Sequence, residues 1–124
     1  MTARTPEDVD RLFGEYVNAG RLDDLVALYE PDAVLVQRGG TARGHAQLRD
    51  ALGTLIAAKT AIAMNVVKVA ESGGVALLYN QWSAKATAPD GSAVEFSGSA
   101  REVVRRQPDG RWLFAIDDPY GGGA

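Results

Sequence analysis

The sequence predicts an α+β fold in which three N-terminal helices pack on one face of a curved, mainly antiparallel sheet. Three observations lead to this fold class. Apolar residues recur with a helical period in the first third of the chain and again over residues 44–58. From residue 61 they alternate with polar residues, as in strands that are buried on one side. Turn sequences separate the segments, which gives the order α-α-β-α-β-β-β-β, and helices segregated from a meander define the class.

The composition suits one globular domain, 1–124, with 46% apolar and 23% charged residues among 124. A net charge of −3 argues against nucleic acid or an anionic membrane as a partner. The chain has no cysteine and one histidine, so we expect no metal and no cofactor. The start of the chain lacks an apolar signal core, and no apolar run approaches the length of a membrane span. We therefore expect a cytoplasmic protein.

The first helix has clear start and stop signals. Thr5 can cap it, Pro6 suits its first position, and Asp8 completes a variant capping box. Gly20 can end it in a left-handed conformation. The apolar residues in between follow the spacing of one helical face: Val9, Leu12, Phe13, Tyr16 and Val17.

Shorter elements follow in the next forty residues. A second helix is predicted to carry Leu22, Leu25, Val26, Leu28 and Tyr29, and to end at Pro31. Residues 33–37 resemble a short strand, and residues 38–40 a turn. A third helix is predicted from about Gly44 to Ala58.

Four β-segments complete the fold, near residues 61–71, 75–88, 93–107 and 111–118. The intervening sequences, at 71–74, 89–92 and 108–110, are typical hairpin turns. The glycine-rich end, residues 121–124, is expected to be frayed.

Alternation along the third of these segments singles out one acid. Its apolar face carries Val94, Phe96, Gly98, Ala100, Glu102 and Val104, and Glu102 is the only charged residue on that face. A carboxylate in apolar surroundings must be paired, hydrogen-bonded or protonated. Glu102 is therefore either a pocket acid of raised pKa or a structural acid bonded to a neighbour.

The segment before it has a similar face. Asn80 is the polar exception there, beside Trp82, whose indole N–H needs a partner. The inner faces of both segments also carry small residues, namely Ala84, Ala86, Gly98 and Ala100. Small residues with a few inward polar groups are typical of a ligand pocket, which we expect here.

The last segment allows two registers. A four-residue loop would pair Arg106 with Arg111, place Glu102 opposite Ala115 and turn Asp117 inward. A three-residue loop would turn Asp118 inward instead. The first register, which we prefer, leaves an outer apolar patch of Leu77, Tyr79, Trp112, Phe114 and Ile116. A homodimer through this outer sheet face is the expected cover.

The element order and three local sequences resemble the ketosteroid isomerase-like, or SnoaL-like, branch of the nuclear transport factor 2-like superfamily. These sequences are NAGRLDDLVALYEPDA at residues 18–33, ARGH at 42–45 and REVVRRQPDGRW at 101–112. The resemblance covers nearly the whole chain. It implies a cone-shaped fold with a deep pocket at the wide end, and in many cases a homodimer.

The resemblance also implies roles for individual residues. Phe13 stands at the position of the oxyanion-hole tyrosine of ketosteroid isomerase, and Gln37 at that of its general-base aspartate. Glu102 matches the second oxyanion-hole acid, and Tyr29 matches a tyrosine that supports the pocket. Since two of the three catalytic positions are replaced, the chain is not expected to be a ketosteroid isomerase of the known type.

The candidate site residues therefore fall into two groups. The catalytic candidates are Glu102 and Asp117, and the alternative role of Asp117 is to cap a turn. The substrate-binding candidates are Asn80, Trp82, Gln37, Tyr16, Tyr29 and Phe13. His45 lies in the first turn of a helix, where the dipole disfavours a charged imidazole, so a surface or capping role is expected.

Two functions remain open. The chain can be a cofactor-free isomerase or cyclase that moves a proton beside the carbonyl of a small apolar compound, with Glu102 as the acid or base. The alternative is a non-catalytic ligand-binding or dimerisation module of the same fold. The inward Glu, Asn and Trp favour the first, and the replaced tyrosine and aspartate favour the second.

Overall fold

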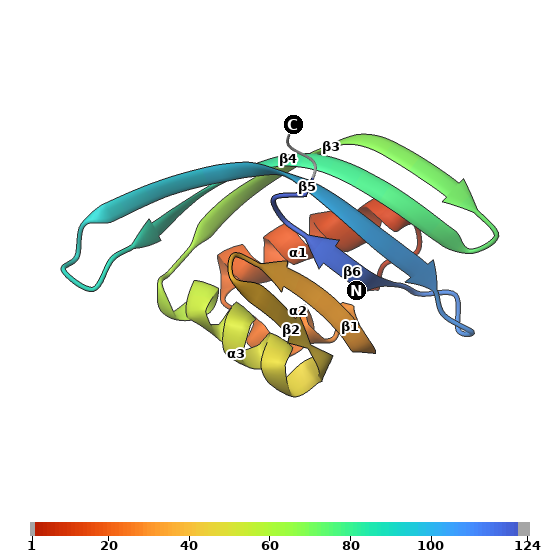
Figure 1. The fold of residues 1–124 in the computed structure, drawn as a ribbon, viewed down its shortest axis with the longest axis horizontal. Coiled ribbons are helices and arrows are strands. Elements are labelled where there is room, and N and C mark those ends of the chain that lie inside the picture. Colours follow the sequence, from red (N-terminus) through yellow and green to blue (C-terminus); the bar gives the residue numbers. More distant parts are fainter. Residues whose placement is uncertain (1, 122–124) are drawn as a thin grey trace.

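A computed structural model describes residues 2–121 and shows helices covered by a strongly curved sheet. In Figure 1 the long strands of the second half of the chain arch over the helices. The helices are α1 (Pro6–Ala19), α2 (Leu22–Val26) and α3 (Gly44–Ala57). The strands are β1 (Tyr29–Gln37), β2 (Gly40–Arg43), β3 (Ala61–Ser72), β4 (Val75–Thr87), β5 (Ala93–Arg106) and β6 (Trp112–Asp118).

The six strands form one sheet in the order β2-β1-β6-β5-β4-β3. All neighbours are antiparallel except β1 and β6, which run parallel. The three hairpins from β3 to β6 form at the predicted turns, and the α+β class is confirmed. The predicted frayed tail, 121–124, lies outside the described residues apart from Gly121.

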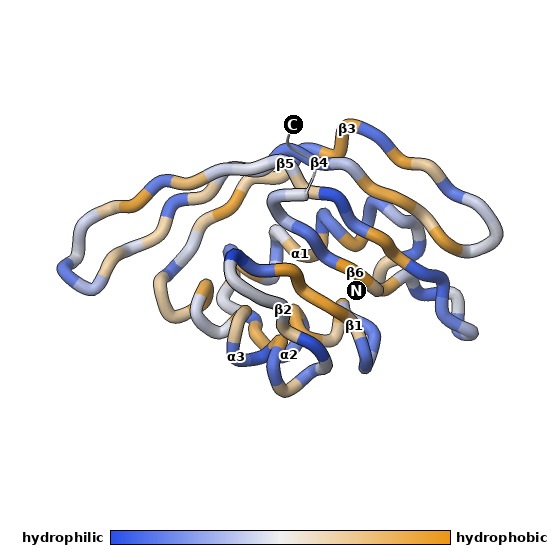
Figure 2. Tube along the Cα trace, viewed as in Figure 1, coloured by the Kyte–Doolittle hydropathy of each residue, from blue (hydrophilic) through white to orange (hydrophobic). Residues whose placement is uncertain are grey.

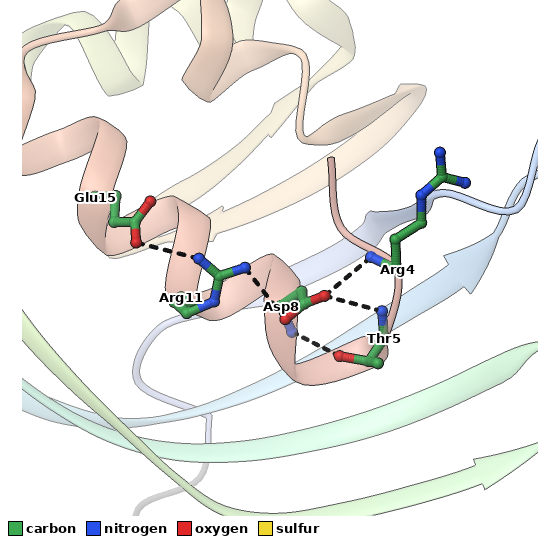
Figure 3. Close-up of polar contacts among 5 residues, drawn as sticks. All are labelled: Arg4, Thr5, Asp8, Arg11 and Glu15. Carbon is green, nitrogen blue, oxygen red and sulfur yellow. Dashed lines mark hydrogen bonds and ion pairs between the residues drawn. The ribbon is translucent and has the colours of Figure 1, made fainter. Parts of the chain in front are cut away.

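The start of α1 confirms the predicted capping box. The Thr5 hydroxyl accepts a hydrogen bond from the Asp8 amide at 3.3 Å, and the Asp8 carboxylate accepts one from the Thr5 amide at 3.2 Å. Figure 3 shows that the same carboxylate binds Arg11, which also contacts Glu15. At the other end Gly20 takes the left-handed conformation, with φ of 70°. These local contacts fix where the helix begins and ends.

The segment after α1 differs from the prediction in two ways. The second helix ends at Val26, and Tyr29 begins β1 instead of belonging to the helix. The Leu28 carbonyl accepts a hydrogen bond from the Phe114 amide at 2.8 Å, so pairing with β6 replaces helical pairing. The predicted turn at 38–40 leads into an additional short strand, β2, because the Gly39 conformation (φ of 90°) folds the chain back on β1.

The core lies between the helices and the concave face of the sheet. Figure 2 shows the alternation of apolar and polar residues as changes of colour along the long strands. The inner residues of β4 and β5 include Leu78 and Val104, which are fully buried against α1. Phe114 of β6 packs against α1, since its ring meets that of Phe13 edge-on with centroids 6.1 Å apart. Within residues 2–121, no helix combines the length and apolar character that a membrane span requires.

Close to the turn, β6 follows the register of the three-residue loop instead of the preferred four-residue loop, and a β-bulge then shifts this register. Arg106 lies opposite Trp112, and Val104 opposite Phe114, but the register then shifts so that Val103 lies opposite Ile116. The extra residue, Ala115, moves the following side chains to the other face. Trp112 and Phe114 precede the bulge, and Phe114 lies opposite the inward-facing Val104, so both are buried in the core rather than exposed on the outer face, which corrects the predicted patch.

Candidate active site

A cavity of about 240 Å³ lies between the concave sheet face, α1 and α3. Its walls are mainly apolar, and Ala84 and Ala100 leave part of the space that larger inner residues would fill. The other apolar side chains of the wall are Phe13, Leu35, Val36, Ala51, Leu52, Leu55, Ile62, Met64 and Phe96. The cavity is therefore a water-poor space into which few polar groups project.

Glu102 and Asp117 form the acidic end of this cavity. They lie directly opposite each other on β5 and β6, and both line the cavity. Only 2% of Glu102 and 3% of Asp117 is exposed to solvent. The bulge at Ala115 creates this pair, because without it Glu102 would not lie opposite Asp117.

A third buried acid, Asp10, extends the pair toward α1. Its exposed fraction is 1%, and its Oδ2 accepts a hydrogen bond from the Asn80 side-chain amide at 3.1 Å. Asp10 is not among the site residues predicted from the sequence. A signal was present, because Asp10 lies three residues before Phe13 and thus on the edge of the apolar face of α1.

Burial in this acid cluster, defined as Asp10, Glu102 and Asp117, raises the pKa of all three carboxyl groups. Burial raises the pKa of Glu102 well above 4.5, and the charges of Asp117 and Asp10 raise it further. Burial likewise raises the pKa of Asp117 to about 7 and that of Asp10 above 3.8. Hydrogen bonding to Glu102 acts in the opposite direction on both aspartates, because it stabilises their ionised forms.

Tyr29 supports Asp117 from the side of β1. Its hydroxyl donates a hydrogen bond of 2.6 Å to Oδ2 of Asp117, and its ring packs on Phe114 with centroids 4.7 Å apart. This bond lowers the pKa of Asp117 against the effect of burial. The parallel pairing of β1 with β6 brings the two residues together.

The open end of the cavity is built from the segment that follows β6. Trp82 donates its indole N–H to the Pro119 carbonyl at 2.7 Å, and the Tyr120 ring meets the Trp82 ring at 5.4 Å. Gly98 makes this packing possible, since a β-carbon there would lie 2.9 Å from Trp82 and 3.0 Å from Tyr120. Gln37 and Arg38, both exposed, complete this end.

Five of the eight predicted site residues line the cavity: Glu102, Asp117, Trp82, Gln37 and Phe13. The other three are not part of its lining: Asn80 binds Asp10, Tyr29 binds Asp117, and Tyr16 is buried on α1. His45 is exposed in the first turn of α3, and its Nε2 lies 2.8 Å from the Tyr29 carbonyl oxygen. Among residues 2–121, no group of three acidic or histidine side chains is arranged to hold a metal ion.

The order of the elements and the curved six-stranded sheet match the nuclear transport factor 2-like fold. The SnoaL-like domain family model matches residues 9–114, so the chain belongs to that family. A comparison with curated proteins gives no match.

Solved structures share the fold at low sequence identity. A ketosteroid isomerase-like protein from Erwinia carotovora has a TM-score of 0.80 and 18% identity, covering 90% of this chain and 89% of its own. A nuclear transport factor 2-like superfamily protein from Salmonella enterica has a TM-score of 0.75 and 15% identity, covering 90% of this chain and 84% of its own. The third is SalBIII, an epoxide hydrolase/cyclase-like enzyme with a role in pyran ring formation in the polyether salinomycin. It has a TM-score of 0.70 and 18% identity, covering 92% of this chain and 88% of its own.

Proposed function

We propose that this protein is a cofactor-free enzyme that transfers a proton beside the carbonyl group of a small, mostly apolar compound. The observation that carries the proposal is the opposed pair Glu102 and Asp117 at the buried end of an apolar cavity. Two adjacent carboxyl groups cannot both ionise easily in such surroundings, so their protonation states separate into one acid and one base.

Glu102 supplies the acid of this pair. Burial and its two acidic neighbours raise its pKa well above 4.5, which favours the protonated carboxyl. Its Oε1 has no hydrogen-bond partner among the described residues. A protonated carboxyl group can donate a hydrogen bond to a substrate carbonyl and stabilise the enolate oxygen as charge develops there.

Asp117 supplies the base. A pKa of about 7 leaves a substantial ionised fraction at neutral pH, and general bases act best when their pKa lies near the working pH. The carboxylate removes a proton from the carbon next to the carbonyl, and the C–H electron pair becomes the enolate. The same carboxyl then returns the proton to that carbon or to a conjugated one, which exchanges or isomerises the substrate.

The remaining predicted residues assist this pair. Asn80 holds Asp10, whose charge keeps Glu102 protonated, so both act as positioning residues. Gln37 and Phe13 line the cavity where a substrate would lie. Trp82 closes the wall beside them and keeps water away from the reacting carbon.

Exchange of carbon-bound hydrogen tests the proposal directly. Aryl alkyl ketones and β,γ-unsaturated cyclic ketones are incubated with the protein in D₂O, and deuterium incorporation and double-bond migration are followed by NMR. We expect catalysed exchange that falls about 100-fold or more in Glu102→Gln and in Asp117→Asn. Glu95→Gln, on the same strand but exposed and paired with Lys85, is the matched control and should keep the activity.

The alternative is a non-catalytic ligand-binding or dimerisation module. Phe13 and Gln37 favour it, because they replace the tyrosine and aspartate of ketosteroid isomerase at the positions implied by the resemblance. Saturable ligand binding without exchange for any ketone of the panel would support the module and overturn the enzyme.

We also propose a homodimer through the outer sheet face. Leu77, Val103 and Ile116 lie in one row across β4, β5 and β6, and Leu77 and Ile116 are 38% and 44% exposed. Sedimentation analysis should give a dimer for the wild type and a monomer for Ile116→Asp. Val94→Asp adds the same charge to the opposite face of β5 and should remain dimeric, and a monomeric wild type would contradict the proposal.

A further inference from the structure

Arg38 lies at the open end of the cavity and carries a positive charge, whereas the acid cluster at the buried end consists of carboxyl groups. It follows β1 in the turn to β2 and lines the cavity beside Gln37. Among the described residues that line this cavity, Arg38 is the only lysine, arginine or histidine. The cavity therefore has a cationic open end and an acidic closed end.

Stacking holds the Arg38 guanidinium in place. Its central carbon lies 4.2 Å from the centroid of the Tyr120 ring. Tyr120 in turn packs against Trp82, which is fixed by its hydrogen bond to Pro119. A guanidinium stacked through its face keeps its N–H donors around its edge, where they can bind a planar anion.

The donors of Arg38 have no anionic partner within the described part of the chain. No carboxylate within residues 2–121 forms an ion pair with Arg38, whereas Arg105 pairs with Glu30 and Arg49 with Asp23. Other unpaired arginines do not line the cavity, so Arg38 alone combines a fixed guanidinium, unused donors and access to a ligand in the cavity.

We propose that Arg38 binds a carboxylate of the substrate, which is thus a carbonyl compound with its acid group at the end remote from the reacting carbonyl. The identity of the reacting group rests on the proposed function, whereas the carboxylate site does not. A guanidinium fork presents two parallel N–H donors, which match the two oxygens of one carboxylate. Repulsion by the ionised Asp117 carboxylate keeps the substrate carboxylate at Arg38, so the carbonyl faces Glu102 and Asp117.

A matched pair of ligands separates the charge from the rest of the molecule. 4-Oxo-4-phenylbutanoate and 4-oxo-4-phenylbutanamide share the ketone and the aryl group, and only the first is an anion. Binding is measured from the quenching of tryptophan fluorescence, since Trp82 lines the cavity. We expect the wild type to bind the acid at least tenfold more tightly than the amide, and this preference to fall as salt is added.

Variants assign the preference to one side chain. Arg38→Gln should remove the preference and leave amide binding unchanged, and Arg38→Lys should retain part of it. Arg43→Gln makes the same charge change on the adjacent strand β2, outside the cavity lining, and should keep the full preference. Thermal unfolding of each variant confirms that the fold is retained.

Three results would overturn the inference: equal binding of acid and amide by the wild type, an unchanged preference in Arg38→Gln, or no saturable binding of either ligand. Its failure can be told apart from failure of the proposed function. If the carbon-bound hydrogen of the amide ligand exchanges but the acid is not preferred, the proposed enzyme stands and the proposed carboxylate site is wrong. If binding shows an Arg38-dependent preference for the acid but no exchange occurs, the carboxylate site stands and the proposed enzyme is wrong.

Discussion

The Tyr29 hydroxyl and the Asp117 carboxylate, 88 positions apart in the chain, are joined by a buried hydrogen bond of 2.6 Å. The bond crosses from β1 to β6, which run parallel in the sheet. It connects the acid cluster to the part of the core in which Tyr29 packs on Phe114. The protonation of Asp117 therefore depends on a residue outside the cavity lining.

Removing this hydroxyl should raise the pKa of Asp117 above its value of about 7. Tyr29→Phe keeps the ring but loses a hydrogen bond that stabilises the ionised carboxylate. A hydrogen bond to a charged group contributes about 1.5–3 kcal/mol, which corresponds to roughly one to two pH units. The measurement is a carbon-13 NMR titration of the aspartate carboxyl groups. Tyr79→Phe, on the opposite sheet face, is the control, and an unchanged Asp117 pKa would contradict the assignment.

The stability of the protein should fall as the pH rises from about 4 to about 7. The pKa of Asp117 is about 7 in the folded state and 3.8 without burial, so between these values the folded protein holds a proton that the unfolded chain has released. Raising the pH then favours the unfolded chain, by about 1.4 kcal/mol per pH unit for each such group. Burial of Glu102 and Asp10 acts in the same direction.

Asp117→Asn should reduce the slope of unfolding free energy against pH by the contribution of one group, about 1.4 kcal/mol per pH unit. Urea unfolding at several pH values between 4 and 8 measures the slope. The control is Asp90→Asn, because the exposed Asp90 carboxyl has a pKa below 3.8 and stays ionised across the window. Equal slopes for the wild type and Asp117→Asn would show that Asp117 does not titrate there.

Glu102→Gln should stabilise the fold at neutral pH by about 1 kcal/mol or more. The wild type must keep the buried Glu102 protonated when the unfolded chain has lost that proton, whereas an amide is neutral in both states. The gain should shrink toward pH 4, where the unfolded chain also holds the proton. Denaturant unfolding at both pH values measures it, with the exposed Glu95→Gln as the control. A loss of about 2 kcal/mol or more would instead assign Glu102 to a structural network.

Gly98→Ala should loosen the segment that closes the cavity. The added β-carbon would lie 2.9 Å from Trp82, 3.0 Å from Tyr120 and 3.1 Å from the Pro119 carbonyl, so these groups must move. We expect a destabilisation of about 1–3 kcal/mol, a shift of the tryptophan emission and a weaker preference for carboxylate ligands. Gly40→Ala is the control, since no atom lies within 4 Å of the β-carbon it would add. An unchanged emission spectrum would show that the segment does not pack as described.

The sequence predicted much of the fold because much of it depends on local signals. The capping residues at Thr5 and Asp8, the left-handed Gly20 and the hairpin turns act over a few residues each. Alternation along β5 also singled out Glu102 without knowledge of its neighbours, since a strand presents every second residue to the same face. Asp10 was missed because its burial depends on which part of α1 faces the sheet.

By itself, the sequence determined the order of the elements except for the short strand β2, the inner faces of the long strands and the presence of an acid among apolar residues. Only the tertiary structure decided that Glu102 faces Asp117, because a bulge at Ala115 shifts the register and a loop length cannot reveal it. It also decided that Tyr29 belongs to β1 and not to the second helix. There, pairing with β6 satisfies backbone groups such as the Leu28 carbonyl, which accepts a hydrogen bond from the Phe114 amide. Both outcomes depend on contacts between residues far apart in the chain, whose free energy outweighs local preference.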